Sequence, residues 1–245
     1  PFAARRVLFA ATARATVVQH VAGGGTAFVQ QDGHLVRMTA AGNTPIIAVH
    51  AIPLTFRGDA PHNVLNALAA AAAADALGVD PSIVAQGLST LRPTPADLPG
   101  RNNVLQRGEQ HIVLDFAHNP ASVTAALQFA TRGFPSDRLT VSIGMPGDRE
   151  DADLHAVADA IASFQPARVV VRELDPVRRG REPGALPALL AARLSQRGVA
   201  DVSIVADDLS AALACTTQTT GTTVMLAVID LHAVVAGLRE TGFTV

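Results

Sequence analysis

The chain of 245 residues contains no lysine, tryptophan or tyrosine, so all 19 of its basic residues are arginine. Without lysine it cannot form a Schiff base with a carbonyl substrate, and it cannot supply the lysine of a phosphate-binding P-loop. A single cysteine, Cys215, excludes a disulfide framework and a metal site built from several cysteines. These absences leave chemistry that works through arginine, histidine, carboxylates and backbone amides.

Net charge and long apolar runs are also scarce. The formal net charge is −2, so no strong electrostatic field draws this chain to nucleic acid or to an anionic membrane. The longest apolar stretch, residues 67–74, is too short to span a bilayer, and no signal peptide is visible. We therefore expect a cytoplasmic protein without nucleic-acid or membrane partners. Its 49% of apolar residues suffice for one large or two modest cores, and homo-oligomerisation is left open.

The first part of the chain, to about Phe56, has a strand-like pattern broken by glycine and asparagine. Short apolar runs lie at residues 7–9, 26–29, 35–38 and 46–49, and the Asp-Gly pair between the second and third predicts a hairpin. The triple glycine at 23–25 lacks the spacing, the following helix and the lysine of a phosphate loop. We interpret it as a turn.

Two helices and a linker follow. An alanine-rich helix is predicted from about residue 61 to 77, and a second over 82–91, with Asp80 as N-cap and Pro81 at N1. Asn63 and Asn66 share one face of the first helix, where they serve either as caps or as ligand contacts. Residues 92–100 include three prolines and form the best linker candidate. We therefore divide the chain into domains 1–98 and 99–245.

The polar turn DFAHNP at residues 115–120 dominates the second domain. The apolar run before it stops at Asp115, and a helix-compatible run begins after Pro120. Such a turn places polar side chains at the carboxyl end of a strand, where ligands of α/β domains bind. Asp115 can accept hydrogen bonds from hydroxyl groups, and His118 and Asn119 can contact phosphate or base. An alternative without function stays open, in which Asp115 caps the helix, His118 packs on the sheet and Pro120 occupies N1.

The rest of the second domain alternates strand and helix. Strands are predicted over 103–106, 111–115, 139–143, 167–171, 202–205 and 224–228, and helices over 121–130, 151–164, 185–196, 209–216 and 231–238. This alternation predicts an α/β fold with a doubly wound, parallel, Rossmann-like sheet. In such a sheet the polar loops at 144–151 and 173–182 fall on the same edge as Asp115. Their arginines could bind carboxylate or phosphate, or could belong to solvated loops. The histidines form no HxH or HExxH spacing, so no metal site is expected.

Three motifs, in chain order, resemble the Mur ligase superfamily. They are HNVLNALAA at 62–70, Pro-Gly-Arg at 99–101 and DFAHNP at 115–120. GDRED at 147–151 and Arg-Gly-Arg at 179–181 look most like the C-terminal half of cyanophycin synthetases, and AHNP is shared with folylpolyglutamate synthetases. The resemblance covers about residues 20–210. It implies that residues 1–98 are the C-terminal portion of a P-loop-type central ATPase domain, and that 99–245 are the Rossmann-like C-terminal domain.

The resemblance also implies a chemistry. Members of the superfamily activate a carboxylate with ATP to an acyl phosphate, which an amine attacks to form an amide. ATP and Mg²⁺ are therefore the implied cofactors, and an amino acid or peptide is the implied substrate. Motif matching assigns nucleotide contacts to Asn63, Asn66, Arg101, Asp115, His118 and Asn119, with Asn66 at adenine, Arg101 at the phosphates and Asp115 at the ribose. It assigns the catalytic positions to Arg101 and His118, and the amine substrate to Asp148, Arg149, Arg179 and Arg181. Such a site works by positioning and charge neutralisation.

The chain departs from the superfamily pattern. The P-loop and the acidic Mg²⁺ ligand that follows it are absent, Asn102 replaces the aromatic residue usual after Pro-Gly-Arg, and the first residue is Pro1 rather than methionine. We therefore expect the C-terminal part of a longer ligase, inactive as an isolated chain. Two alternatives remain. One is another Mur-type ligase, acting on a peptidoglycan precursor or a folate, and the other is a truncated, non-catalytic module that binds nucleotide or a partner. An NAD-binding Rossmann protein is disfavoured, because no GxGxxG follows a first strand.

Overall fold

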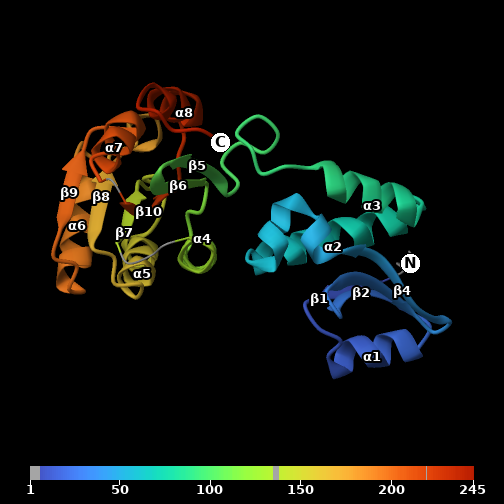
Figure 1. The fold of residues 1–245 in the computed structure, drawn as a ribbon. Helices are drawn as coiled ribbons and strands as arrows, with labels where there is room; N and C mark the ends of the chain where they lie inside the picture. The colour runs from blue at the N-terminus through green and yellow to red at the C-terminus, as the bar shows by residue number, and fades with distance from the viewer. Residues whose placement is uncertain (1–5, 135–137, 219) are drawn as a thin grey trace. The chain divides into compact units, whose positions relative to one another are not determined.

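The computed structural model describes residues 6–134, 138–218 and 220–245. The chain divides into two compact units, Pro1–Arg92 and Pro93–Val245. The division falls at the start of the proline-rich segment in which the sequence analysis placed a linker. Figure 1 shows the elements of each unit.

The first unit is a four-stranded mixed sheet between helices. Its elements are β1 (Val7–Ala10), α1 (Ala15–Ala22), β2 (Thr26–Gln31), β3 (His34–Thr39), β4 (Gly42–Ala48), the 3₁₀ turns η1 (Val49–Ala51) and η2 (Pro53–Gly58), α2 (Pro61–Ala76) and α3 (Pro81–Thr90). The strand order is β1-β2-β3-β4, with β1 parallel to β2 and the other pairs antiparallel. The predicted hairpin at Asp32 is confirmed, and so are Asp80 as N-cap and Pro81 at N1 of α3.

Helix α1 corrects the prediction of an all-strand segment before Phe56. Val17 and Val21, one helical turn apart, are buried against Ala27 and Val29 on one face of the sheet. The other face carries Phe28 and packs on α2. A run rich in valine and threonine favours a strand locally, but burial of the Val17–Val21 stripe stabilises a helix here.

The second unit has the Rossmann-like α/β fold that the strand–helix alternation predicted. Its elements are β5 (Asn103–Arg107), β6 (Glu109–Asp115), α4 (Pro120–Gly133), β7 (Leu139–Ile143), α5 (Asp151–Ala162), β8 (Arg168–Arg172), η3 (Asp175–Val177), α6 (Ala185–Gln196), β9 (Val202–Val205), α7 (Asp208–Cys215), β10 (Thr220–Leu226) and α8 (Leu231–Glu240). The strand order is β5-β6-β10-β7-β8-β9. Strands β6 to β10 are mutually parallel, and β5 is antiparallel to β6. The insertion of β10 between β6 and β7 was not predicted.

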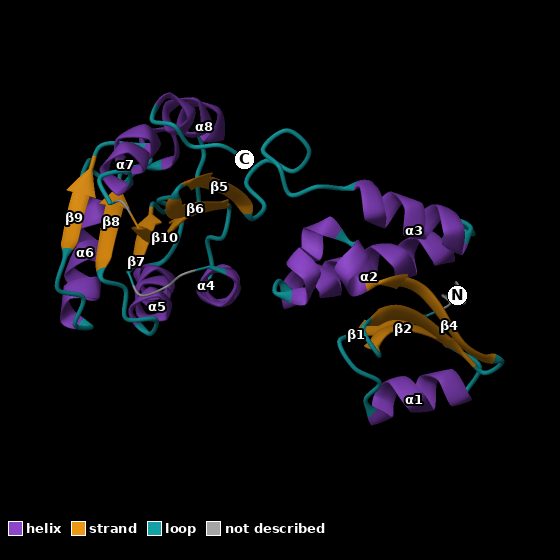
Figure 2. Ribbon diagram, viewed as in Figure 1, coloured by secondary structure: helices purple, strands orange, loops and turns teal. Residues whose placement is uncertain are grey.

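Helices cover both faces of this sheet (Figure 2). Helices α7 and α8 pack on the face formed by Leu105, Ile112, Leu114 and Met225. Helices α4, α5 and α6 contact one another in sequence on the opposite face, where Leu127 is among the fully buried side chains. Because both faces are covered, most strands contain a short, fully buried apolar stretch, such as 112–114, 169–171 and 224–226, which is why they were recognisable in the sequence.

The last residues of the chain lie along the outer edge of β5. Gln106 and Thr244 exchange two backbone hydrogen bonds, of 2.7 and 2.9 Å, in an antiparallel bridge. The Arg107 guanidinium lies 4.6 Å from the centre of the Phe243 ring and donates to the Thr241 carbonyl at 2.9 Å. Residues 241–244 are thereby fixed to the sheet.

Candidate functional site

The carboxyl ends of four parallel strands meet at one edge of the second sheet. In the strand register Leu226 of β10 lies beside both Asp115 of β6 and Ile143 of β7, and Ile143 lies beside Val171 of β8. The loops that follow these strands therefore share this edge. The expectation that loops 144–151 and 173–182 lie on the edge of Asp115 is confirmed.

A cavity of about 260 Å³ opens at this edge. Its walls come from all four loops: Phe116, His118, Pro146, Asp148, Arg149, Leu174, Val177, Arg179, Ala227 and Ile229. Four of the predicted site residues thus line one cavity. A larger groove, of about 540 Å³, runs between Pro95, Pro99 and α8, but none of the predicted site residues lines it. We therefore place the candidate site in the smaller cavity.

Asp115 joins the start of the second unit to the polar turn. Its Oδ2 accepts from the backbone N–H of Asn102 at 2.9 Å, and its Oδ1 accepts from that of Ala117 at 2.8 Å. Burial raises the pKa of this carboxyl, against the lowering effect of these two amides and of the nearby Arg101 charge. A carboxylate has further lone pairs, so Asp115 can still accept from a ligand hydroxyl.

Phe116 lies between two predicted site residues. The Arg101 guanidinium lies 5.9 Å from the centre of the Phe116 ring, and the His118 ring makes an edge contact at 5.5 Å. His118 Nδ1 lies 3.0 Å from the Phe116 carbonyl oxygen, which fixes the orientation of the imidazole. The exposed Phe116 was not predicted as a site residue.

The helix after the turn is capped by Asn119. Its Oδ1 accepts from the Ser122 N–H at 2.9 Å, and the Ser122 hydroxyl accepts from the Asn119 N–H at 3.2 Å, which completes a capping box. The purely structural interpretation of this turn placed Pro120 at N1 and Asp115 as the cap of the helix. Pro120 is indeed at N1 of α4, but the cap is Asn119 and not Asp115. Asn119 therefore has a structural task at the edge of the site.

Asn103 organises the segment that carries Arg101, and the sequence analysis read it only as the start of a strand. It is fully buried, donates to the Pro93 carbonyl at 3.0 Å and the Leu98 carbonyl at 2.8 Å, and accepts from the Gly100 N–H at 2.7 Å. The Asn103 side chain thus forms hydrogen bonds with three backbone groups that lie outside any helix or strand and so lack the partners that regular secondary structure supplies.

The loops after β7 and β8 are joined by Arg181. Its guanidinium donates to the Gly147 carbonyl at 3.2 Å, to the Arg149 carbonyl at 2.6 Å and to the Asp151 carboxylate at 2.7 Å. Gly147 also donates its N–H to the Val177 carbonyl at 2.9 Å. Arg181 was predicted to bind substrate, but it is engaged in holding the two loops together.

The two arginines that line the cavity differ in whether a protein group already binds them. Arg179 forms an ion pair with Asp148, and both side chains are about half exposed. Among the described residues the Arg149 side chain has no hydrogen-bond or ion-pair partner, and its Nε is buried. Arg149 is therefore the cation of this cavity that can accept an anionic ligand group without losing a protein partner.

Asn63 and Asn66 lie in the first unit, in the first turns of α2. Asn63 is buried and donates to the Leu54 carbonyl at 3.0 Å, while its Oδ1 accepts from Asn66 Nδ2 at 3.1 Å. Asn63 thus ties η2 to α2, and the exposed Asn66 retains its amide oxygen for another contact.

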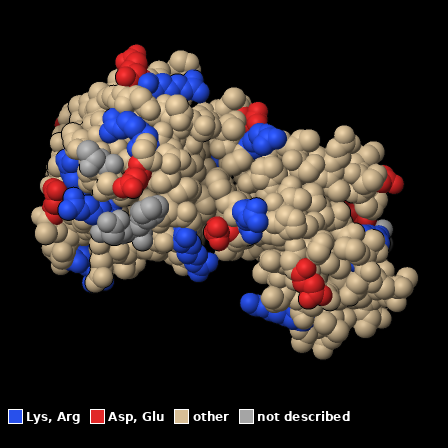
Figure 3. All heavy atoms as spheres, in the orientation of Figure 1, with Lys and Arg blue, Asp and Glu red and all other residues tan. Residues whose placement is uncertain are grey.

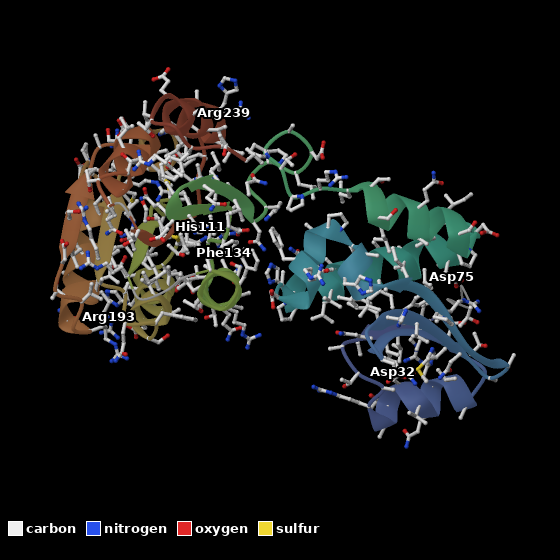
Figure 4. The ribbon with its side chains drawn as sticks, in the orientation of Figure 1. Asp32, Asp75, His111, Phe134, Arg193 and Arg239 are labelled. Atoms are coloured by element: carbon white, nitrogen blue, oxygen red, sulfur yellow. The ribbon has the colours of Figure 1, made fainter. Side chains whose placement is uncertain are left out.

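Among the described residues no group of three histidine, cysteine, aspartate or glutamate side chains is placed to hold a metal ion. His111 is an example of a packed histidine, because its ring lies 4.9 Å from that of Phe134. Figure 4 labels both residues. Burial lowers the His111 pKa, partly offset by a backbone hydrogen bond of Glu109.

On the face in Figure 3, arginines and acidic residues are interspersed. Within the described ranges no helix combines the length and apolar character needed to cross a bilayer.

Comparison with known proteins decides the family. The model of the Mur ligase, glutamate ligase domain matches residues 100–227, which include the loops after β6, β7 and β8 that line the cavity. The chain belongs to the Mur ligase family. Its similarity to the cyanophycin synthetase of Trichormus variabilis is 35% identity over 180 residues, which is 74% of this chain and 20% of that protein. UDP-N-acetylmuramoyl-L-alanyl-D-glutamate–2,6-diaminopimelate ligase of Corynebacterium efficiens is 34% identical over 138 residues, 56% of this chain and 24% of that protein.

Solved Mur ligase structures share the fold. Folylpolyglutamate synthase of Mycobacterium tuberculosis, complexed with ADP, has a TM-score of 0.58 at 22% identity, over 88% of this chain and 47% of that one. The D-alanyl-D-alanyl ligase of Acinetobacter baumannii, which acts on UDP-N-acetylmuramoylalanyl-D-glutamyl-2,6-diaminopimelate, has a TM-score of 0.57 at 19% identity, over 89% and 45% of the two chains. This chain therefore spans about a fifth of the length of the cyanophycin synthetases and about half that of these structures.

Proposed function

We propose that this chain is part of an ATP-dependent ligase that joins a carboxylate to an amine through an acyl phosphate, as in a cyanophycin synthetase. In this proposal the second unit binds the amino-acid or peptide amine in the cavity. The observation that carries it is that three separate loops bring Phe116, His118, Arg149 and Arg179 to one opening at the carboxyl edge of the sheet. Ligand sites of open α/β sheets lie at such edges.

The nucleotide side of the proposal rests on Asp115 and Arg101. Asp115 has free acceptor capacity for ribose hydroxyls, and the exposed Arg101 can neutralise phosphate charge. His118 lines the nucleotide, and together with Arg101 it is the proposed catalytic residue. Asn119 supports them by capping α4. In the first unit, Asn66 is proposed to contact adenine and Asn63 to hold it in place.

The amine side rests on Arg149. Because Arg179 is paired with Asp148 and Arg181 is occupied by the loops, Arg149 is the proposed partner of a substrate carboxylate. A cavity of about 260 Å³ suits a ligand of amino-acid size.

The residues present fit the hydroxyl and phosphate groups of ATP through Asp115 and Arg101. Within the described ranges no three metal-ligating side chains are grouped, so a magnesium ion here would take most of its ligands from phosphate and water. The chain also contains no lysine, so it cannot supply the P-loop lysine that holds the ATP phosphates. We therefore propose that the chain binds ligands but does not form an amide on its own.

Titration calorimetry of the 245-residue chain tests this function, with ADP, L-aspartate, L-glutamate and L-arginine as separate probes. Asp115→Ala is expected to weaken ADP binding about tenfold or more, since a hydrogen bond to a charged group contributes about 1.5–3 kcal/mol. Arg149→Ala is expected to weaken amino-acid binding by a similar factor. Arg132→Ala, an exposed arginine on α4, is the matched control and should change neither affinity.

Two results would contradict the proposal. One is an unmodified chain that binds none of the four probes. The other is an amino-acid affinity that falls equally in Arg149→Ala and Arg132→Ala, because the cavity would then not be the site. ADP binding without amino-acid binding would favour a nucleotide-binding module.

A further inference from the structure

Among the described residues the most buried charged group, Arg172, lies near the cavity edge. Arg172, the last residue of β8, is 1% exposed, and Asp208, in the first turn of α7, is 4% exposed. Arg172 Nε donates to Asp208 Oδ1, its Nη1 donates to the Ser142 hydroxyl at 3.0 Å, and its Nη2 donates to the Leu226 carbonyl. The guanidinium therefore connects the carboxyl ends of three neighbouring strands to a helix.

The second oxygen of Asp208 holds the segment after β10. Oδ2 accepts from the backbone N–H of Ile229 and from that of Asp230, each at 2.8 Å. Just before them, Ala227 has a φ of +53°, a left-handed conformation that costs a non-glycine residue about 1 kcal/mol or more. Residues 227–230 thus keep an unfavourable backbone shape while one buried carboxylate binds their amides.

This segment forms a wall of the candidate site. Ala227 and Ile229 line the 260 Å³ cavity, whereas Arg172 and Asp208 do not. Asp208 can therefore act on a ligand through the backbone of residues 227–230, which we call the β10 wall.

Stability alone does not explain the pair. Replacing a buried ion pair by apolar residues of similar volume is often neutral or stabilising, because desolvation of two charges offsets their attraction. Apolar side chains, however, cannot accept hydrogen bonds from Ile229 and Asp230. The pair provides a hydrogen-bond acceptor that fixes the path of the β10 wall, and a leucine or methionine cannot provide one.

We propose that Arg172 and Asp208 are positioning residues of the cavity, which fix the β10 wall in the conformation that binds ligand. Arg172 orients the Asp208 carboxylate, and the carboxylate holds the wall. The effect on ligand affinity rests on the function proposed above, whereas the effect on the wall does not depend on it.

Two double variants separate the acceptor from the charges. R172M/D208N removes both charges but keeps an amide oxygen for the wall, and R172M/D208L removes the charges and the acceptor. Hydrogen–deuterium exchange of the 245-residue chain, followed by NMR, measures the Ile229 and Asp230 amides. The leucine variant is expected to exchange both about tenfold or more faster than the asparagine variant, and the amides of Val224 and Met225 in β10 should differ less.

Calorimetry with L-aspartate, L-glutamate and L-arginine then measures the consequence for the site. The asparagine variant should retain the affinity of the unmodified chain within a few-fold, and the leucine variant should lose about tenfold at similar melting temperature. Equal protection of the wall amides in both double variants would overturn the proposal. So would lost protection with unchanged affinity, even though the proposed function would survive. If no probe binds the unmodified chain, the proposed function fails, and the exchange rates alone decide whether the pair holds the wall.

D208A keeps Arg172 and serves as the second variant if the leucine double variant does not fold. It is expected to raise exchange at the same two amides, and unchanged exchange there would overturn the proposal.

Discussion

Replacing Gly147 by alanine is expected to force apart the two loops that border the cavity. The backbone of Gly147 contacts the loop after β8 so closely that an added Cβ would lie 1.8 Å from the Arg178 carbonyl oxygen and 3.1 Å from Arg181 Cγ. Since ordinary contact begins at 3.4 Å, the loops would have to separate by about 1.5 Å. The φ of Gly147 is not in the left-handed region, so the cost comes from space alone.

The size of the effect follows from the bonds at this contact. A separation of this size breaks the 2.9 Å bond from the Gly147 N–H to the Val177 carbonyl and weakens the 3.2 Å bond from Arg181 to the Gly147 carbonyl. Two hydrogen bonds at about 1 kcal/mol each, with about 1 kcal/mol of residual overpacking, give a loss of about 3 kcal/mol. For a unit of this size, that lowers the melting temperature by about 6–12 °C.

Differential scanning calorimetry of G147A measures this loss, and G133A is the matched control. At Gly133, the last residue of α4, the nearest heavy atom would lie 3.9 Å from the new Cβ, so the melting temperature should stay unchanged or rise slightly. Amino-acid affinity should fall in G147A, because the loop carries Asp148 and Arg149 into the cavity. A melting temperature of G147A equal to that of G133A would refute the close packing of the two loops.

Three further predictions concern single buried groups. Since burial raises the Asp115 pKa, the folded chain binds this proton more tightly than the unfolded one, and the stability of the unmodified chain relative to D115N should fall as pH rises above about 4. Urea unfolding at several pH values measures the difference, and an increase with pH would contradict the assignment. Asn103→Asp loses the two donors to the Pro93 and Leu98 carbonyls, so it should lower the unfolding free energy by about 2–4 kcal/mol in chemical denaturation; an unchanged midpoint would disprove this role. Burial raises the pKa of Cys215 to about 11, so a thiol reagent at pH 8 should label it only after unfolding, and rapid labelling of the native chain would show the thiol to be accessible.

Much of the fold was readable from local pattern, but two features were not. Apolar runs bounded by turn residues located the strands of the second unit, because the apolar stretch within most of these strands is buried between helices on both faces of the sheet. The order of those strands, with β10 between β6 and β7, depends on contacts between residues 111 apart in the chain for β6 and 83 apart for β7, and it leaves no local signal. Helix α1 was missed because its valines favour a strand, and only burial of Val17 and Val21 on the sheet decides for a helix.

The sequence predicted where the candidate site lies, but it did not predict the hydrogen bonds and ion pairs that support the site. Position after a strand was enough to bring His118, Arg149 and Arg179 to one edge. The supporting contacts were not visible, since Arg172 and Asp208 are 36 residues apart and each resembles an ordinary charge at the end of an element. The structural role of Asn103 was equally hard to predict, because its hydrogen-bond partners lie in a segment without regular secondary structure.

The bridge between Gln106 and Thr244 has a consequence for how this domain avoids association. An exposed edge strand offers unpaired backbone groups to other chains and is a common start of aggregation. Here the Gln106 N–H and C=O on the outer side of β5 are already paired with Thr244, and Arg107 fixes the neighbouring Phe243. Removing only the exposed Thr244 and Val245 would keep the buried Phe243 in the core but open this edge. Such a truncation is therefore more dangerous for solubility than for folding.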